Sequence, residues 1–264
     1  MSIIWHNGTF RTDQPVFMAH DRLRLGDGVF DTMLAVDGKI IAAEEHCERL
    51  KRHAGVFNIH VDTNPLIMAA SELLKKNDLL SDHAVINTII TRGPANRGLK
   101  TPNNPDIQIV MRASYVPTDM PPPRLIIARS VRRNEGSPLS QIKSVNYGDS
   151  ILARIEADNA GANDAIFLNN AGHVTCATGS NVFITQAGKL YTPPLSDGVM
   201  DGIIRAKIIR MYGAIEQSLT SADIEAADGL YLTNSVGGAR AAESLNGRAF
   251  SLPSLRIDND IHLR

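Results

Sequence analysis

The chain has 264 residues, of which 43% are hydrophobic and 21% are charged, and its formal net charge is -1. A near-neutral chain offers no electrostatic reason to bind nucleic acid or an anionic membrane surface, and no apolar run approaches the roughly 20 residues that span a bilayer. Cys47 and Cys176 form neither a metal-binding spacing nor a disulfide framework, and the N-terminus lacks the features of a signal peptide. We therefore expect a cytoplasmic protein that acts on a small molecule and holds no metal.

The first half of the chain mixes strand patterns with helix patterns. A strand with a turn at Asn7-Gly8 is expected over residues 3–10, and Asp37-Gly38 is a hairpin signal inside the apolar run 29–41. Asn64 is the expected N-cap of a helix in which Pro65 comes first. The other elements expected here are helices over 44–57 and 64–80 and strands over 84–91 and 107–115.

A proline-rich segment divides the chain. Residues 116–123 contain four prolines, which exclude a helix or a central strand and favour a stiff extended connection. We therefore expect a smaller N-terminal α+β domain over 1–116, a linker over 117–123 and a larger C-terminal domain over 124–264.

The second half also combines strands and helices. Strands are expected over 125–131, in a pair turning at 169–172, in a pair over 181–191 and over 229–233, with helices over 148–159 and 202–212. The sequence contains no internal repeat and no low-complexity segment.

Several short motifs occur in an order and spacing that are typical of one enzyme group. They are Gly26-Asp27-Gly28-Val29-Phe30, His46-x-x-Arg49-Leu50, Thr91-Arg92-Gly93 with Arg97-Gly98, Lys143-x-x-Asn146, Gly172-x-Val174 with Asn181-x-Phe183, Thr192-Pro193-Pro194, Gly202-Ile203-Ile204-Arg205 and Thr233-Asn234-Ser235. Each motif is weak alone, but together they resemble the fold-type IV pyridoxal-phosphate (PLP) enzymes. This group includes branched-chain aminotransferases, D-amino acid aminotransferases and 4-amino-4-deoxychorismate lyases. The resemblance implies an α/β (α+β) two-domain fold like that of D-amino acid aminotransferase, PLP as cofactor, and a homodimer.

The resemblance makes Lys143 the residue that forms the Schiff base with PLP and then acts as general base. A lone lysine is otherwise most often a solvated surface residue. Desolvation beside Ile142 and Val145 would lower its pKa, which suits both tasks. Thr32 resembles a lyase-type threonine that relays a proton near this lysine.

The resemblance also implies a set of residues that bind the cofactor. Arg49 is expected to bind the phosphate, with a surface pair to Glu45 or Glu48 as the alternative. The N–H groups of Ile203 and Ile204 would bind the phosphate at a helix start. The remaining cofactor-binding residues implied are Tyr147, Cys176, Asn181, Asn234 and Ser235.

Arg97 and Phe30 are the expected substrate-binding residues. Arg97 lies in a loop marked by glycine and proline, and in this family such a loop reaches towards the active site. Its guanidinium would bind a substrate carboxylate through two hydrogen bonds. The alternative is an ordinary solvent-exposed loop arginine.

Cys176 is a departure from the family pattern, which has a glutamate at this place. A carboxylate there keeps the pyridine nitrogen of PLP protonated and so strengthens the cofactor as an electron sink. A neutral thiol does this far less well. The alternative is that Cys176 is simply a small buried hydrophobic residue.

The departure bears on which reaction is expected. Transamination depends heavily on the electron sink, whereas elimination of pyruvate from 4-amino-4-deoxychorismate is driven by the aromatic product, p-aminobenzoate. Residues 26–32 and 142–146 also look closer to the lyase branch. We therefore expect an aminodeoxychorismate lyase. The alternatives are a D-amino acid or branched-chain aminotransferase, and a non-catalytic protein that binds PLP or a related phosphate ligand.

Overall fold

The computed structural model describes residues 2–13, 17–81, 83–116, 120–250 and 255–263. The chain forms two compact units: unit 1 is Met1–Thr118 with Lys143–Asn146, and unit 2 is Asp119–Ile142 with Tyr147–Arg264. The chain thus leaves unit 2 after Ile142, contributes four residues to unit 1, and returns to unit 2 at Tyr147. The expected C-terminal domain over 124–264 is contiguous and includes residues 143–146, whereas these four residues belong to unit 1. Residues 117–119 of the expected linker lie outside the described residues.

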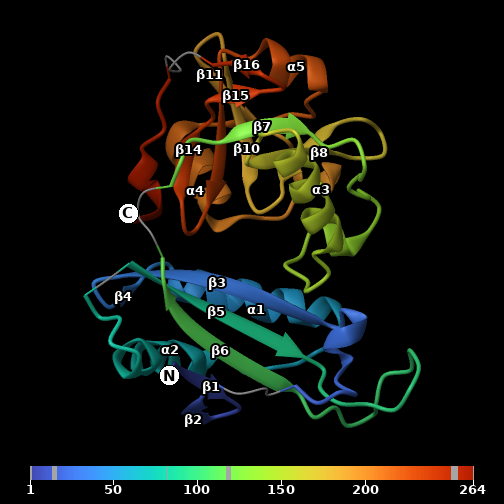
Figure 1. Ribbon diagram of the computed structural model, residues 1–264, viewed down its shortest axis with the longest axis vertical. Helices are drawn as coiled ribbons and strands as arrows, with labels where there is room; N and C mark the ends of the chain where they lie inside the picture. Colours follow the sequence, from blue (N-terminus) through green and yellow to red (C-terminus); the bar gives the residue numbers. More distant parts are fainter. Residues whose placement is uncertain (1, 14–16, 82, 117–119, 251–254, 264) are drawn as a thin grey trace. The chain divides into compact units, whose positions relative to one another are not determined.

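Unit 1 is built on a six-stranded antiparallel sheet with the order β2-β1-β6-β5-β3-β4 (Figure 1). Its strands are β1 (Ile3–His6), β2 (Thr9–Thr12), β3 (Gly28–Val36), β4 (Lys39–Ile40), β5 (His83–Thr91) and β6 (Gln108–Tyr115). Asp37 and Gly38 have φ values of 48° and 75°, so the expected two-residue hairpin joins β3 to β4. The segment 3–10 is the start of a second hairpin, in which β2 returns along β1 after Asn7 and Gly8.

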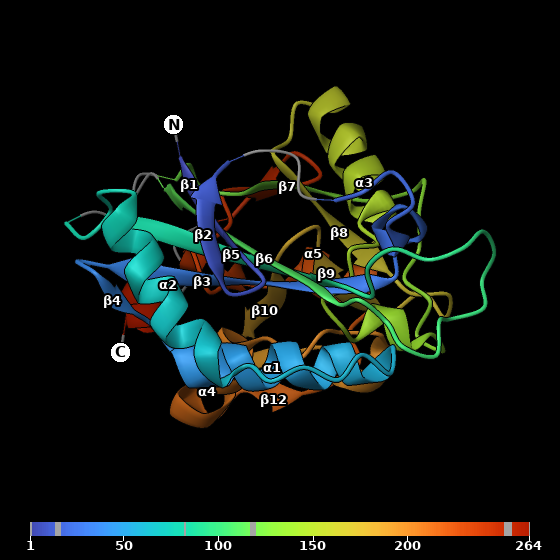
Figure 2. The ribbon, with the colours of Figure 1, turned by 90° about the horizontal axis from the view of Figure 1, so that it is seen from below.

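Two helices, α1 (Ala43–Val56) and α2 (Asn64–Lys76), pack on this sheet. Helix α1 packs on β3, α2 packs on β1 and β6, and the two helices also contact each other, as Figure 2 shows. Their buried residues supply much of the core of unit 1: Leu50, Ala54, Leu66, Ala70, Leu73 and Leu74. A short 3₁₀ helix, η1 (Arg22–Leu25), precedes β3.

Both ends of α2 differ from the expectation. The N-cap is Thr63, and Asn64 is the first helical residue, because the side chain of Asp62 accepts its N–H at 3.0 Å. The helix ends at Lys76 rather than at residue 80 because Asn77 binds β1 instead. Its side chain accepts the N–H of Ile3 at 2.8 Å and donates to the Ile3 carbonyl at 2.9 Å.

Unit 2 contains a mixed sheet with the order β12-β11-β10-β9-β8-β7-β15-β16, and β13 pairs with both β10 and β14. The strands are β7 (Arg124–Ile127), β8 (Asp164–Leu168), β9 (Val174–Ala177), β10 (Asn181–Gln186), β11 (Lys189–Thr192), β12 (Ile215–Glu216), β13 (Gly229–Asn234), β14 (Gly238–Ala241), β15 (Ser244–Leu245) and β16 (Arg248–Ala249). The sequence did not predict β12, β14, β15 or β16.

The helical elements of unit 2 are η2 (Pro138–Ser140), α3 (Gly148–Asn159), η3 (Leu195–Asp197), α4 (Ile203–Tyr212), α5 (Ser221–Ala226) and η4 (Asn259–Leu263). Helix α3 packs on β8, and α4 packs on β13. Helix α5 was not predicted, although it begins with a capping box in which Thr220 and Asp223 bond to each other's backbone. Among the described residues, no helix has the length and apolar character needed to cross a bilayer.

Candidate active site

The backbone around Lys143 is fixed within unit 1. The N–H of Phe30 donates to the carbonyl of Lys143 at 2.9 Å, and the N–H of Val145 donates to the carbonyl of Gly28 at 3.1 Å. The Lys143 segment therefore runs antiparallel along β3. In addition, the N–H of Lys143 donates to Nδ1 of the buried His53 at 3.1 Å. These bonds hold the backbone from which the amine extends.

Two motifs that lie 120 residues apart in the sequence meet at Asn146. The Asn146 side chain donates to the carbonyl of Gly26 at 2.9 Å. Gly26 has a φ of 73°, and a Cβ there would lie 2.0 Å from the Asn146 Oδ1. A Cβ on Gly28 would lie 2.5 Å from the carbonyl oxygen of Ile90. Close approach therefore requires both glycines of the Gly-x-Gly motif.

The amine of Lys143 lies over the ring of Phe30, with 4.2 Å between Nζ and the ring centroid. Burial lowers the pKa of Lys143 to about 8; the charge of Asp31 opposes this shift and the charge of Arg49 adds to it. Only the neutral amine is a nucleophile or a base, so this pKa brings both functions towards physiological pH.

We expect Lys143 to become reactive towards an amine-directed reagent with a midpoint near pH 8, against an ordinary lysine pKa of about 10.4. Reactivity should rise with pH because deprotonation creates the nucleophile. Competitive labelling with isotopic acetic anhydride, followed by mass spectrometry of the peptide, measures this midpoint. The exposed Lys39 serves as the reference in the same sample. A midpoint at the ordinary lysine value would contradict the prediction.

Asp31 extends from β3 towards α1, where it binds both motif residues of that helix. Its carboxylate accepts from Arg49 Nε at 2.9 Å and from Arg49 Nη2 at 2.8 Å, and its Oδ1 lies 2.8 Å from His46 Nδ1. All three residues are at most 3% exposed. Burial would raise the pKa of the Asp31 carboxyl, but the His46 hydrogen bond and the Arg49 charge hold it well below its usual range. The alternative of a surface pair between Arg49 and Glu45 or Glu48 is therefore wrong.

The pair with Asp31 orients the guanidinium of Arg49. Both bonds come from Nε and Nη2, and neither uses Nη1. Binding of a phosphate by Arg49 remains a prediction, and Nη1 is the nitrogen that we expect to make it.

Thr32 and Phe30 lie two positions apart on β3, so their side chains extend from the same face of the strand. Asn87 is paired with Thr32 on β5 and donates its side-chain amide to Thr32 Oγ1 at 3.1 Å. The Phe30 ring contacts the Lys143 amine, so Thr32 extends from the same face of β3 as the residue under this amine. The sequence did not point to Asn87, because nothing in the strand pattern distinguishes it. The proton relay by Thr32 and the substrate contact of Phe30 remain predictions.

Arg97 lies in the loop that joins β5 to β6 and is exposed. Its position keeps open both the expected contact with a substrate carboxylate and the alternative of an ordinary exposed arginine.

Three residues of unit 2 form one row across β9, β10 and β13. Cys176 pairs with Asn181, and Asn181 pairs with Thr233. All three are buried. Cross-strand partners extend to the same face of a sheet. The row therefore runs from Cys176 to the end of β13, where Asn234 is the last strand residue and Ser235 follows.

Asn181 also supports the turn before α4. Its Nδ2 donates to the carbonyl of Met200 at 2.9 Å, and a Cβ on Gly202 would lie 2.0 Å from its Oδ1. Gly202 is the N-cap of α4 and has no side chain with which to cap the first turn. The N–H groups of Ile203 and Ile204 therefore stand at a helix start, which favours an anion. The role that the structure shows for Asn181 is to hold this turn.

Asn234 shapes the turn that follows β13. Its Oδ1 accepts the N–H groups of Val236 at 3.0 Å and Gly237 at 2.7 Å, and its Nδ2 donates to Ser180 Oγ at 3.0 Å. Ser235 is half-buried within this turn. Asn234 thus holds the backbone around Ser235, and contact of either residue with the cofactor remains a prediction.

Arg133 lies beside Cys176 in unit 2, although no sequence motif pointed to it. Its guanidinium carbon is 4.6 Å from the centroid of the Phe167 ring, and its Nη2 donates to Ser150 Oγ at 3.3 Å. Burial would lower the pKa of Arg133, but interaction with Cys176 and then with Tyr147 raises it. Arg133 therefore adds positive charge beside two of the expected cofactor residues. An arginine in an irregular segment carries no sequence signal of this role.

The donor groups of unit 2 fit a ligand with a phosphate and a polar ring. The buried Arg133 Nε and Thr233 Oγ1 have no hydrogen-bond partner among the described residues. Buried polar atoms of proteins are normally satisfied, so such atoms often mark a place where a ligand binds. Together with the start of α4, these atoms fit the phosphate and the polar ring of PLP. Binding of its aldehyde by the amine of Lys143 remains a prediction.

Comparisons with known proteins agree with this assignment. The family described as amino-transferase class IV matches residues 28–245. The chain is 31% identical to a Methanocaldococcus jannaschii protein named "Putative branched-chain-amino-acid aminotransferase", over 94% of this chain and 89% of that one. It is 28% identical to the aminodeoxychorismate lyase of Bacillus subtilis, over 89% and 83%. A Legionella pneumophila crystal structure named "Putative 4-amino-4-deoxychorismate lyase" is similar with a TM-score of 0.84 and 35% identity, over 90% of both chains.

The match extends across both units, and the chain has the two-sheet α/β fold of the fold-type IV enzymes. The expected fold is thereby confirmed. The chain therefore belongs to the class IV aminotransferase family, whose enzymes use pyridoxal 5′-phosphate.

Proposed function

We propose that the protein is a PLP-dependent lyase that releases pyruvate from 4-amino-4-deoxychorismate and leaves p-aminobenzoate. The observation that carries this proposal is Cys176, a thiol beside the Arg133 guanidinium at the position where the family pattern has a glutamate. The similarity to the Legionella pneumophila and Bacillus subtilis proteins supports it.

When bound, PLP withdraws electrons from the substrate carbon that carries the amine. A carboxylate beside the pyridine nitrogen would strengthen this withdrawal, and neither Cys176 nor Arg133 carries one. Release of pyruvate makes the remaining ring aromatic, so the product itself favours the step. A lyase is therefore the reaction that this pair of residues hinders least.

The residues of the chain have distinct proposed roles. Lys143 binds the cofactor through its amine and then, with a pKa of about 8, takes the substrate proton. Thr32, whose hydroxyl accepts from Asn87, relays a proton to the departing enolpyruvate, which thereby becomes pyruvate. Arg49 and the first turn of α4 bind the phosphate. Arg97 binds a substrate carboxylate.

A second candidate function is amino-group transfer. The 31% identity to the Methanocaldococcus jannaschii protein favours it. A protein that only binds the cofactor is a third candidate, but a protein that only binds a phosphate has no use for the amine of Lys143.

The homodimer that the resemblance implies is also part of our proposal. A mass of twice the chain mass in sedimentation equilibrium would support it.

The first test is an assay of both reactions on the PLP-loaded protein. Release of p-aminobenzoate and pyruvate in equal amounts from aminodeoxychorismate supports the lyase. Faster transfer of an amino group from D-alanine or a branched-chain amino acid to 2-oxoglutarate would show that the protein is an aminotransferase instead. Absence of both reactions would leave a protein that binds without turnover.

Replacing Cys176 with glutamate is expected to raise aminotransferase activity by about tenfold or more, equal to roughly 1.4 kcal/mol of barrier. It should leave lyase turnover within about threefold, because elimination depends less on the electron sink. Steady-state rates of both reactions measure this. Cys176→Gln is the matched control, since it has the shape of glutamate without the charge. A large rise in lyase turnover in the glutamate variant alone would contradict our account of the thiol.

A further inference from the structure

The loop that carries Arg97 is closed at its base in unit 1. Gly93 has a φ of 81°, and a Cβ there would lie 1.8 Å from the carbonyl oxygen of Asp106. The Gly93 N–H donates to Thr91 Oγ1 at 3.0 Å, and its carbonyl accepts the N–H of Arg22 at 3.1 Å. The two ends of the loop therefore meet at a point where only glycine fits.

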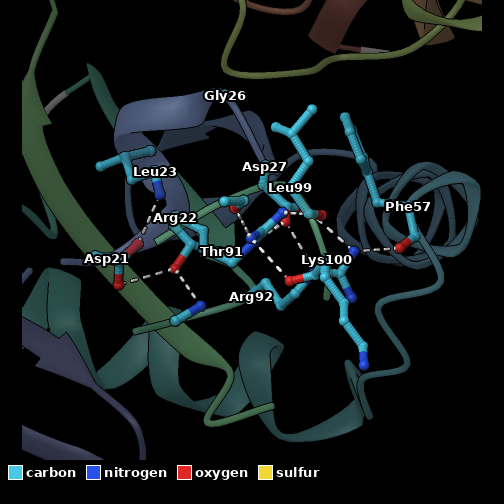
Figure 3. Close-up of polar contacts among 12 residues, drawn as sticks. Asp21, Arg22, Leu23, Gly26, Asp27, Phe57, Thr91, Arg92, Leu99 and Lys100 are labelled. Atoms are coloured by element: carbon cyan, nitrogen blue, oxygen red, sulfur yellow. Dashed lines mark hydrogen bonds and ion pairs between the residues drawn. The ribbon is translucent and has the colours of Figure 1, made fainter. Parts of the chain in front are cut away.

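One buried side chain, Arg22, holds the outer part of this loop (Figure 3). Its Nη1 donates to the carbonyls of Gly98 at 3.1 Å and Lys100 at 3.4 Å, and its Nη2 donates to that of Leu99 at 3.3 Å. Leu99 is 81% exposed. The loop is thus held through three successive carbonyls rather than through burial of that apolar side chain.

Asp27 fixes the direction of the Arg22 guanidinium. Asp27 is buried and accepts from Arg22 Nε, from Arg92 Nε at 2.8 Å and from Arg92 Nη2 at 3.1 Å. Burial would raise the pKa of Asp27, but its bonds to Arg92 and Arg22 lower it. Arg92 also donates to the carbonyl of Phe57, at the end of α1 (Figure 3). One shared carboxylate therefore links the loop to the helix end.

We propose that Arg22 is a positioning residue that holds this loop so that Arg97 is preorganised to bind the substrate carboxylate. This inference rests on the proposed function, because it takes Arg97 as the substrate-binding residue. Arg97 immediately precedes Gly98, whose carbonyl is the first of the three that Arg22 binds. Fixing that backbone before the substrate arrives removes an ordering cost from binding. Arg22 then affects the substrate only through Arg97.

The test is a double-mutant cycle on the PLP-loaded protein. Arg22→Lys keeps a positive charge near Asp27 but replaces the forked guanidinium by a single nitrogen. We expect it to raise KM for aminodeoxychorismate about tenfold and to change kcat by less than about twofold. In an Arg97→Ala background the same substitution should change KM by less than about twofold. Arg24→Lys, on the exposed side of η1, is the matched control and should change neither parameter.

Hydrogen exchange of the substrate-free proteins provides a readout that does not depend on activity. Amides of residues 95–101 should exchange about tenfold faster in Arg22→Lys than in the wild type, while peptides from β3 and β5 stay unchanged. Unchanged loop exchange would overturn the positioning role. A KM rise of the same size with and without Arg97 would overturn the connection to Arg97.

The two proposals fail in distinguishable ways. If Arg97→Ala leaves KM unchanged, or the wild type turns over no substrate, the substrate half of the inference falls with that part of the proposed function. The exchange measurement still decides whether Arg22 holds the loop. If Arg22→Lys folds poorly, Arg22→Gln replaces it in both measurements.

Discussion

Replacing Lys143 with alanine is expected to lower turnover by at least about 10³-fold, because the variant loses both a nucleophile and a general base. The fold should persist, since the bonds that hold this segment run from backbone atoms and do not use the Lys143 side chain. The measurements are turnover in the presence of PLP and the absorption spectrum during a titration with PLP. The band of lysine-bound cofactor should appear in the wild type and be absent from the variant.

Two controls make this result specific to the amine. Lys143→Arg keeps the positive charge without a nucleophile, and it should be as inactive as the alanine variant. Added methylamine should restore part of the turnover of Lys143→Ala, because it replaces the missing base. A wild-type absorption band in Lys143→Ala would show that another lysine binds the cofactor.

Replacing Asp31 with asparagine is expected to cost about 3–5 kcal/mol of the free energy of unfolding. The change leaves Arg49 and His46 buried beside a neutral group in place of the carboxylate that they now share. Urea denaturation at pH 7 measures the loss. The Asp31 carboxyl has a lowered pKa in the folded state, so its contribution is complete above about pH 4 and is lost as the pH falls further. The difference between wild type and variant should therefore shrink in acid.

Asp37→Asn is the matched control for this prediction. Asp37 is an exposed turn residue with a φ of 48°, a conformation that asparagine tolerates equally well. Its replacement should change the free energy of unfolding by less than about 0.5 kcal/mol.

The Asp31→Asn variant should also lower the labelling midpoint of Lys143, because the charge of Asp31 raises the pKa of that lysine. A stability loss below about 1 kcal/mol for Asp31→Asn would contradict the buried ion pair.

The motifs predicted the family, the cofactor and the fold, but they did not show why these residues occur together. Gly26 and Asn146 belong to separate motifs, and their contact explains both at once. The same holds for Asp31, which binds the two motif residues of α1. Such pairs are set by the tertiary fold, so periodicity and local preference in a single sequence do not show them.

Some residues could not have been predicted because their neighbours come from distant elements. Arg133 gains its meaning only beside Cys176 and Phe167, and Asn87 only across the strand from Thr32. The N-cap of α2 was wrong for a local reason, since the side chain of Asp62 competes for the N–H of Asn64. Whether elimination or transfer occurs depends on small differences in the same set of residues, and the motifs are common to both reactions.

The excursion of Lys143–Asn146 into unit 1 also affects how the chain folds while it is being synthesised. When residues 1–118 have left the ribosome, the edge of β3 at Gly28 and Phe30 still lacks the strand that later covers it. An uncovered edge of this kind can pair with another chain. The nascent N-terminal half therefore passes through a stage prone to association, which ends only when the segment with Lys143 has been made.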